Sequence, residues 1–175
     1  MLLQQIGIVP DQVVSPDIDE SPSRDELPRP YAERMAREKA AAVVSADRLV
    51  LAADTVVAAG RRILNKAEDA AQVRDFLMLL SGRRHRVLTA VALVSPDGRR
   101  TERLVETAVT FNRLTEAQID RYIATREGEG KAGGYAINGY AAGFVRFLSG
   151  SYSGVVGLPL FETAQLLRGH GWQIP

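Results

Sequence analysis

Two charged residues stand where the local sequence pattern favours apolar side chains. Asp54 lies in the apolar run LVLAADTVVAA, residues 49–59, where a buried carboxylate needs a cation or a hydrogen-bond partner. Lys39 follows Met35 by four residues, so it falls on the apolar stripe of a helix predicted at residues 31–44. Each residue leaves two interpretations open. The carboxylate either bonds a turn at the strand end or belongs to a functional site. The ammonium either reaches water along the core or binds a phosphate.

Two further charged residues, Glu20 in DIDES and Lys66 in ILNKAED, lie in predicted loops, where each alone would simply be solvated. Together with Asp54 and Lys39, they could give one site two carboxylates and two ammonium groups. Carboxylate oxygens bind Mg²⁺ and ammonium groups bind phosphates, so the set favours metal-dependent chemistry on a polyphosphate. No Ser–His–acid arrangement is evident, which argues against acyl transfer. A structural alternative stays open, in which Asp54 and Lys39 only pair within the core.

The glycine-rich stretch GEGKAGGYAINGYAAGF, residues 128–144, invites comparison with a phosphate-binding loop. A P-loop requires a lysine followed by Ser or Thr, but Ala132 follows Lys131 here. Glycines also allow tight turns and close approach of the backbone to a ligand. We therefore expect a turning or ligand-facing segment that is not a P-loop.

Hydrophobic periodicity and turn residues predict the elements that must position these side chains. Strands are expected at residues 12–15, 49–59, 61–64, 85–95, 99–112, 144–148 and 153–157. Helices are expected at residues 31–44, 69–82, 115–127 and 158–171, the third of them capped by Thr115. Strands and helices alternate without strict βαβ repetition, so we expect an α/β fold with a mixed sheet covered by helices on both faces.

Composition limits the class of protein. The chain has 175 residues, a formal net charge of +1 and no cysteine, so we expect a single domain, residues 1–175, without disulfides or thiolate chemistry. The near-neutral charge gives no support for nucleic acid or an acidic membrane as a partner. His85 and His170 are too few and too far apart in sequence to suggest a histidine metal site. No apolar run is long enough for a membrane span and no signal peptide is evident, which favours the cytoplasm.

The order of these motifs resembles the Maf family of septum formation inhibitor proteins, which are nucleoside triphosphate pyrophosphatases. The resemblance rests on DIDES, AERMAREKA, VLAADTVV, ILNKA, LMLLSGRRHRVLTAVALV, EGKAGGYAINGYAAGFV and GSYSGVVGLPLFET, which follow the family's order over nearly the whole chain. It implies a twisted mixed sheet flanked by helices, with two lobes around a cleft, related to inosine triphosphate pyrophosphatases. The stretch EGKAGGYAING resembles the branch that acts on dTTP and UTP.

The resemblance also implies a role for each site residue. Asp54 and Glu20 match catalytic carboxylates that bind a divalent metal cation, Mg²⁺ or Mn²⁺. Asp54 would activate the water that attacks the α-phosphorus and expels pyrophosphate. Lys39 and Lys66 match phosphate-binding lysines, and Thr55 matches a position that sets specificity.

Three positions depart from the family pattern. Asn138 replaces the usual glutamine at a substrate-binding position and keeps its donor and acceptor on a shorter side chain. Gly130 replaces an aspartate before Lys131, which we also expect to contact the substrate. The sequence Asn65-Lys66-Ala67 replaces Gly-Lys-Pro, which keeps the lysine but changes the turn.

The opening residues MLLQQIGIVP have the pattern of the last turns of a helix that stops at Gly7 and Pro10. In the family, this pattern follows a strand and an S-x-S-P-R-R loop that binds the triphosphate. We therefore expect that strand and loop to be missing here. A misassigned start codon is favoured over a real truncation, because the four charged site residues persist.

Two interpretations of the whole protein follow. The first is a pyrophosphatase that converts dTTP, UTP or related modified pyrimidine nucleotides to the monophosphate and pyrophosphate. The second is a catalytically weak nucleotide-binding regulator of septum formation that acts through a partner. The resemblance also implies a homodimer as an oligomeric state.

Overall fold

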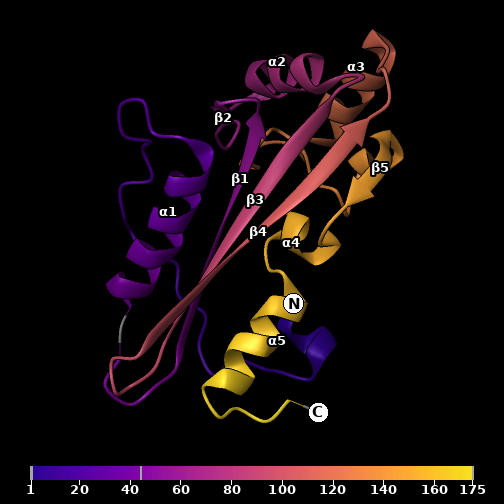
Figure 1. Cartoon of the computed structure of the whole chain (residues 1–175). Helices are drawn as coiled ribbons and strands as arrows, with labels where there is room; N and C mark the ends of the chain where they lie inside the picture. The colour runs from indigo at the N-terminus through magenta and orange to yellow at the C-terminus, as the bar shows by residue number, and fades with distance from the viewer. Residues whose placement is uncertain (1, 44, 175) are drawn as a thin grey trace.

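The computed structural model describes residues 2–43 and 45–174, which form a twisted five-stranded sheet with helices packed around it (Figure 1). The strands are β1 Val50–Ala59, β2 Arg62–Leu64, β3 Arg84–Val94, β4 Arg100–Phe111 and β5 Val145–Ser149, in the spatial order β2-β1-β3-β4-β5. The helices are α1 Pro28–Ala42, α2 Ala70–Leu80, α3 Glu116–Thr125, α4 Tyr152–Val156 and α5 Leu160–Gly169, with 3₁₀ helices η1 Leu2–Ile6 and η2 Tyr140–Phe144. The expected α/β fold, with a sheet flanked by helices, is confirmed.

Tight hairpins account for the pairing of the long strands. β3 and β4 pair from Arg84–Thr110 to Val94–Arg100, and Gly98 turns the chain between them with a φ of +81°. Every pairing between the named strands is antiparallel, whereas the sequence led us to expect a mixed sheet. Short turns between β1 and β2, and between β3 and β4, reverse the chain and so impose this direction.

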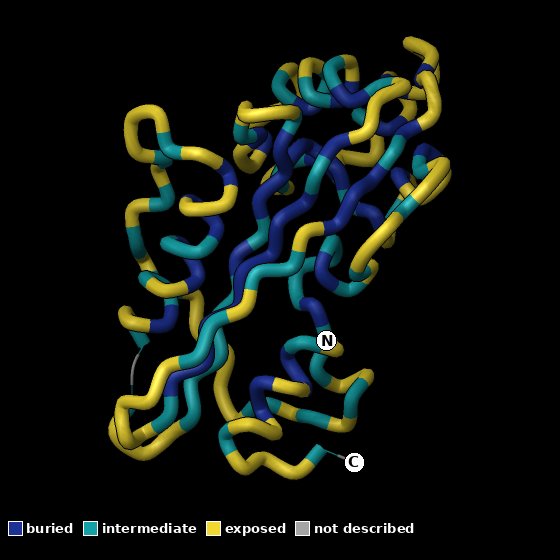
Figure 2. The backbone as a smooth tube through the Cα atoms, viewed as in Figure 1, coloured by how far each residue is buried: buried dark blue, intermediate teal, exposed yellow. Residues whose placement is uncertain are grey.

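The alternation of side chains along β1 divides its residues between two cores. Val56 packs with Met35 of α1 on one face of the sheet. Val57 points to the other face, where it joins a core formed with α2 and α3. Successive strand residues point to opposite faces, so Asp54 faces α1 and Thr55 faces away from it. Figure 2 shows the buried residues concentrated along the central strands between these layers.

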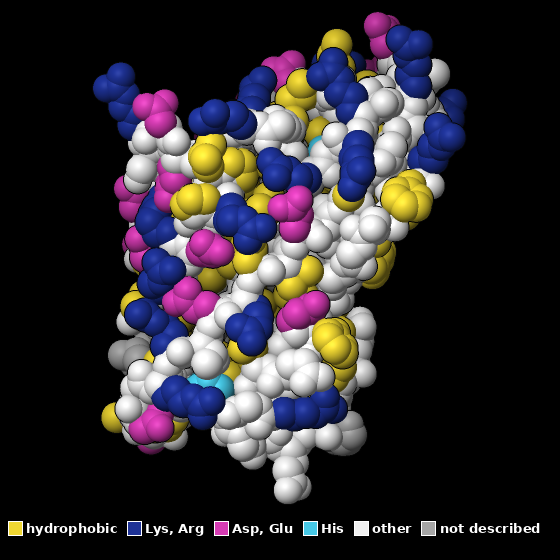
Figure 3. All heavy atoms as spheres, viewed as in Figure 1, with side chains coloured by type: hydrophobic (Ala, Val, Ile, Leu, Met, Phe, Trp, Pro, Cys, Tyr) yellow, Lys and Arg dark blue, Asp and Glu magenta, His cyan; other side chains and the backbone are white. Residues whose placement is uncertain are grey.

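Surface ion pairs also hold α1 against the sheet. Arg37 of α1 lies 3.0 Å from Glu102 of β4, and Arg29 lies 3.6 Å from Glu106. Figure 3 shows acidic and basic side chains interspersed on this face of the molecule. Such exposed pairs contribute little stability individually, so the apolar contacts of α1 remain its main support.

Capping residues set the starts of two helices. Asp69 accepts a hydrogen bond from the N–H of Gln72 at the start of α2, and Thr115 forms a capping box with Gln118 at the start of α3. The predicted Thr115 cap is therefore confirmed.

Among residues 2–43 and 45–174, none of the helices has both the length and the apolar character needed to cross a membrane.

Helix α1 begins at Pro28, three residues before the predicted start at Tyr31. The first turn of a helix leaves its N–H groups without intrahelical partners, so Pro28 and Pro30 are tolerated there. The predicted end of this helix, Val44, lies outside the described residues.

Two of the predicted strands are wrong. Residues 12–15 form no strand and have no partner strand among the described residues, and Val13 is 72% exposed. Residues 153–157 lie in and directly after α4, because the side chain of Ser151 accepts a hydrogen bond from the N–H of Gly154 and so caps a helical turn.

The glycine-rich segment crosses the loop that carries Lys66. The N–H of Ala67 donates to the carbonyl oxygen of Lys131 at 3.1 Å, and the N–H of Gly130 donates to the carbonyl oxygen of Ala67 at 2.8 Å. Gly133 follows with a φ of +67°, which confirms the expected turning segment. These contacts fix the position of the Lys66 loop after β2.

Replacing Gly133 by Ala is expected to lower the free energy of unfolding by about 2 kcal/mol. An added Cβ would lie 2.8 Å from Cβ of Val57, closer than real Cβ contacts allow, and the φ is also strained for alanine. Gly130 is the matched control, since its φ is +71° but nothing lies within 4 Å of an added Cβ. Urea unfolding should show a loss of only about 1 kcal/mol for Gly130→Ala. Equal losses for the two variants would refute the role of the Val57 contact.

Candidate active site

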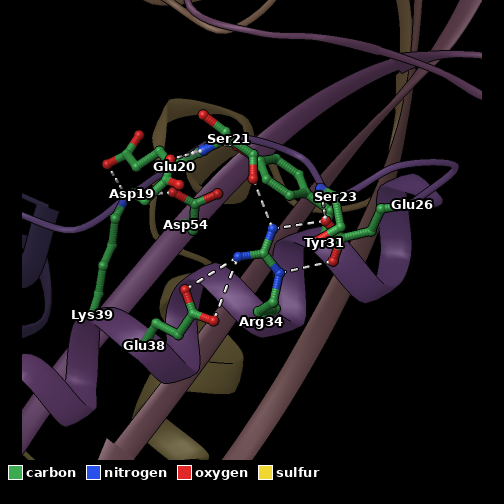
Figure 4. A network of polar contacts seen from close by, with 10 residues as sticks. All are labelled: Asp19, Glu20, Ser21, Ser23, Glu26, Tyr31, Arg34, Glu38, Lys39 and Asp54. Carbon is green, nitrogen blue, oxygen red and sulfur yellow. Dashed lines mark hydrogen bonds and ion pairs between the residues drawn. The ribbon is translucent and has the colours of Figure 1, made fainter.

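Four charged side chains form one continuous series of ion pairs. Lys39 Nζ lies 2.5 Å from Asp54 Oδ1 and 2.9 Å from Glu20 Oε1. Lys66 Nζ lies 2.5 Å from Glu20 Oε2. Asp54 comes from β1, Lys39 from α1, Glu20 from the loop before α1 and Lys66 from the loop after β2. Figure 4 shows the Lys39 side chain extending from α1 toward the carboxylates.

Helix α1 also holds the loop that carries Glu20 (Figure 4). The Tyr31 hydroxyl donates to the carbonyl oxygen of Glu20 at 2.6 Å, and Arg34 donates to the carbonyl oxygen of Ser21 at 3.0 Å. Arg34 also binds Glu26 through two hydrogen bonds of 2.9 and 2.7 Å, the paired geometry that guanidinium and carboxylate groups favour. A proline-rich segment without regular structure is thus fixed at Glu20 and at Ser21, the residue that follows it.

A cavity of about 310 Å³ opens beside these ion pairs. Its lining includes Glu20, Tyr31, Asp54, Thr55 and Lys66. The cavity lies along the edge of β1. That edge is open beside Asp54 and Thr55, because β2 pairs only with residues 57–59. Among the described residues, no strand pairs with residues 50–56 on that side. Asp54 and Thr55 point to opposite faces of the sheet, and the open edge lets both reach the cavity.

The surroundings of the two carboxylates shift their pKa values in opposite directions. Burial raises the pKa of Asp54, which is 9% exposed, and the hydrogen bond from Lys39 offsets this only in part. Burial also acts to raise the pKa of Glu20, but hydrogen bonds from Lys66 and Lys39 outweigh it, so this pKa is lowered. Of two carboxylates with diverging pKa values, the one with the raised pKa is better suited to accept a proton.

Burial acts in the opposite sense on the lysine between them. It favours the neutral amine, but the hydrogen bonds and charges of Asp54 and Glu20 outweigh it, so the pKa of Lys39 is raised. Lys39 therefore remains an ammonium group at neutral pH. A permanent positive charge stands between the two carboxylates.

Comparison with known proteins identifies the family. The family model described as Maf-like protein matches residues 1–170. This chain belongs to the Maf-like family. The resemblance inferred from the order of the sequence motifs is confirmed.

Relatives of this Maf-like chain carry an enzyme name. A protein of Gluconobacter oxydans named dTTP/UTP pyrophosphatase is 63% identical over 175 residues, which cover 96% of this chain and 80% of the relative. Proteins of the same name from Rhodospirillum rubrum and Caulobacter vibrioides are 60% and 57% identical over 174 residues. These alignments cover 98% of this chain and 83% and 90% of the two relatives.

The Maf-like fold brings five of the predicted site residues together. Asp54, Lys39, Glu20 and Lys66 are joined by ion pairs, and Thr55 lines the same cavity. The pair expected under the structural alternative also forms, since Lys39 contacts Asp54. However, Lys39 contacts Glu20 as well and both carboxylates line the cavity, so the pair is not enclosed in the core.

The other two predicted substrate-binding residues lie apart from this group. The side chains of Lys131 and Asn138 are exposed and do not line the cavity. The backbone of Lys131 is nevertheless bonded to the loop that carries Lys66. Their contact with a substrate stays a prediction.

Sequence reasoning missed Arg34, which fixes the loop around Glu20. Helical spacing connects Arg34 with Glu38, four residues later, and that ion pair forms at 3.2 Å. No periodic signal connects Arg34 with Glu26, because Glu26 lies before the helix begins. Only the path of the loop reveals this second partner.

The carboxylates of Asp54 and Glu20 fit a divalent metal in the chemistry of their donor atoms. Both contact the Lys39 ammonium, so they converge on a single positive charge. Mg²⁺ is commonly bound by one or two carboxylates, with water and substrate phosphates completing its ligands. Within the described part of the chain, no group of three or more His, Cys, Asp or Glu side chains could hold a metal by itself. The donor set therefore suits a metal that arrives with a polyphosphate.

Proposed function

We propose that this chain is a nucleoside triphosphate pyrophosphatase that converts dTTP and UTP to the monophosphate and pyrophosphate. The observation that carries the proposal is the Asp54 carboxylate, buried at the wall of a cavity and in contact with Lys39. The names and high identity of the relatives support the substrate class. Neither these names nor the geometry of the described residues favours the regulator of septum formation.

In the proposed reaction, Asp54 accepts a proton from the attacking water. The water oxygen forms a bond to the α-phosphorus, the bond from that phosphorus to the bridging oxygen breaks, and pyrophosphate leaves with the electron pair. The raised pKa of Asp54 supports this role, because a proton acceptor with a raised pKa holds the proton more readily during the reaction.

Lys39 and Lys66 are proposed to bind the phosphate oxygens. Each ammonium group contacts Glu20, and phosphate oxygens can take the place of that carboxylate. Lys66 is 59% exposed, which leaves it free to follow a ligand, whereas Lys39 is held by Asp54.

A divalent cation, Mg²⁺ or Mn²⁺, is proposed to be held by Asp54 and Glu20. When bound, it would supply positive charge that stabilises the phosphoryl oxygens. Asn138, Lys131 and Thr55 are proposed to contact the rest of the nucleotide. A homodimer and a cytoplasmic location also stay predictions.

A panel of nucleoside triphosphates tests the proposed function. Purified protein is incubated with dTTP, UTP, dCTP, dATP and dGTP in the presence of Mg²⁺ or Mn²⁺, and pyrophosphate release is measured. Release from dTTP and UTP above an Asp54→Asn variant supports the proposal. Asp75→Asn, at an exposed position of α2, is the matched control and should behave as the unsubstituted chain does. Release that Asp54→Asn retains in full would contradict the assigned role.

The pH dependence of turnover follows from the Asp54 pKa. The carboxylate must be ionised to accept a proton, and burial raises its pKa above the ordinary value of 3.8. We therefore expect kcat/KM to fall as the pH decreases through a value above 3.8. A pH profile of kcat/KM for dTTP, with protein stability measured at each pH, gives this value. An acid limb at or below the ordinary value would contradict the role of the buried carboxylate.

A further inference from the structure

A hydrogen-bonded series of groups leads from the cavity into the protein interior. Thr55 of β1 and Thr89 of β3 are directly opposed across the sheet, and their Oγ1 atoms lie 3.1 Å apart. Thr89 is 1% exposed, and its hydroxyl donates to the carbonyl oxygen of Gly154 in α4 at 2.7 Å. The series therefore ends on an oxygen that can only accept.

The end of this series determines its direction. A threonine hydroxyl has a single proton to donate and two lone pairs with which to accept. Thr89 gives its proton to Gly154, so in the contact between the two hydroxyls Thr55 must be the donor. Thr55 lines the cavity, and its hydroxyl then has only lone pairs left for a further hydrogen bond. Its branched side chain has few rotamers, which keeps these lone pairs in place.

The position of the Gly154 carbonyl is itself fixed. The N–H of Ser151 donates to Oγ1 of Thr107 at 3.0 Å, which attaches the start of α4 to β4. The Ser151 side chain then accepts from the N–H of Gly154 at 3.0 Å. The carbonyl oxygen of Gly154 also accepts from the N–H of Gly157 at 3.0 Å. The short helix thus presents this oxygen to Thr89 in one orientation.

We propose that Thr89 and the Gly154 carbonyl hold the Thr55 hydroxyl as a hydrogen-bond acceptor that selects a donor group on the nucleoside. This inference rests on the proposed function and deepens it. Ionised phosphate oxygens carry no proton, so they are not partners for Thr55. A thymine or uracil ring offers an imide N–H, whereas the corresponding nitrogen of cytosine is an acceptor. A sugar hydroxyl is the other donor on the substrate, but dTTP and dCTP share it, so the imide N–H is the donor that we assign to Thr55.

The variant Thr89→Val tests the proposal. Valine keeps the shape of the threonine, and the Gly154 carbonyl keeps its hydrogen bond from Gly157. The Thr55 proton is then free to turn toward the cavity, so Thr55 can donate as well as accept. We expect the ratio of kcat/KM for dTTP over dCTP to fall about tenfold, mainly through KM. Thr89→Ser retains both hydrogen bonds and should preserve the ratio.

A purely structural role of Thr89 predicts a different result. Thr89→Val would then lower the melting temperature and reduce kcat/KM for all substrates alike, so the ratio of kcat/KM for dTTP over dCTP would not change. An unchanged ratio in folded Thr89→Val overturns the proposal. If Thr89→Val does not fold, Thr55→Val provides the test, because it removes the acceptor without altering the contact of Thr89 with α4. Its ratio should also fall, and an unchanged ratio again overturns the proposal.

Two analogues distinguish the donor groups on the substrate. If Thr55 accepts from the imide, N3-methyl dTTP should be hydrolysed no better than dCTP, and the 3′-deoxy analogue should match dTTP. A poor 3′-deoxy analogue, together with a small dTTP to dCTP ratio in the unsubstituted chain, would place the donor on the sugar and so overturn the selection of the base. Full activity with both analogues overturns the proposal.

Binding of α,β-methylene dTTP and dCTP, measured by calorimetry, separates the failure of this inference from failure of the proposed function. The chain could release no pyrophosphate and still bind the dTTP analogue more tightly than the dCTP analogue, with this preference lost in Thr89→Val. That result would refute the proposed enzymatic activity but support the proposed selection by Thr55. Equal binding of the two analogues, alongside full activity of the N3-methyl and 3′-deoxy compounds, refutes the selection and retains the enzyme.

Discussion

Replacing Asp54 by Asn is expected to lower kcat for dTTP by about 10²–10⁴-fold, because the amide cannot accept the proton of the attacking water. The fold should tolerate the change. Lys39 loses one partner at 2.5 Å but keeps Glu20 at 2.9 Å, so no buried charge is left unpaired. We expect the free energy of unfolding to change by about 1 kcal/mol, the net value of one hydrogen bond.

The same variant distinguishes the active site from the structural alternative. If Asp54 and Lys39 only stabilised the core, Asp54→Asn should reduce the melting temperature and leave no specific defect in turnover. Measuring kcat and the melting temperature on one preparation decides between them. Asp75→Asn is the control for both measurements, since Asp75 is exposed on α2. A large loss of stability with a proportionate loss of activity would favour the structural alternative.

Replacing Lys39 by Met is expected to have the opposite balance of effects. Asp54 is 9% exposed and forms its ion pair with Lys39, so this change leaves a buried carboxylate without a cation. Breaking a buried pair in this way costs about 3–5 kcal/mol. Turnover should also fall, because the ammonium is proposed to bind phosphate oxygens. Urea unfolding and steady-state kinetics measure the two effects separately.

Two comparisons make the Lys39 result specific. The double variant Lys39→Met, Asp54→Asn removes the orphaned charge, so its stability should recover toward that of the unsubstituted chain while activity stays low. Lys66→Met is the matched lysine control. Its side chain is 59% exposed, so it should raise KM with a loss of stability of no more than about 1 kcal/mol. Similar stability losses for the two lysine variants would contradict the buried-pair argument.

The long elements of the fold were predictable from sequence because their patterns are periodic. The apolar runs of β1 and β3 and the capped start of α3 at Thr115 carry strong local signals. The strand predicted at residues 12–15 failed because a strand also needs a neighbour to pair with, which a short local pattern cannot supply. The strand predicted at residues 153–157 was wrong because Ser151 caps a helical turn there.

Parts of the candidate site were predictable for a different reason. Asp54 and Lys39 break the apolar patterns of a strand and a helix, so each is visible in its own segment. The contact of Lys39 with Glu20 was not predictable from local patterns, because the path of the loop that carries Glu20 depends on hydrogen bonds from Tyr31 and Arg34. Thr89 also breaks an apolar pattern, because its hydroxyl lies within the buried run of β3, but this pattern break is weaker than that of a charged residue.

The open edge of β1 also constrains how substitutions could alter the substrate preference of this protein. In a strand paired on both sides, consecutive side chains serve separate layers, and one ligand cannot meet both. Here Asp54 and Thr55 line one cavity, so the proposed proton acceptor and the proposed selector are neighbours only about 3.8 Å apart along the backbone. A shift of β1 by a single residue would turn each side chain to the opposite face of the sheet. If both proposals hold, reaction chemistry and nucleotide preference are carried by one dipeptide, and substitutions that alter the backbone there should alter both together.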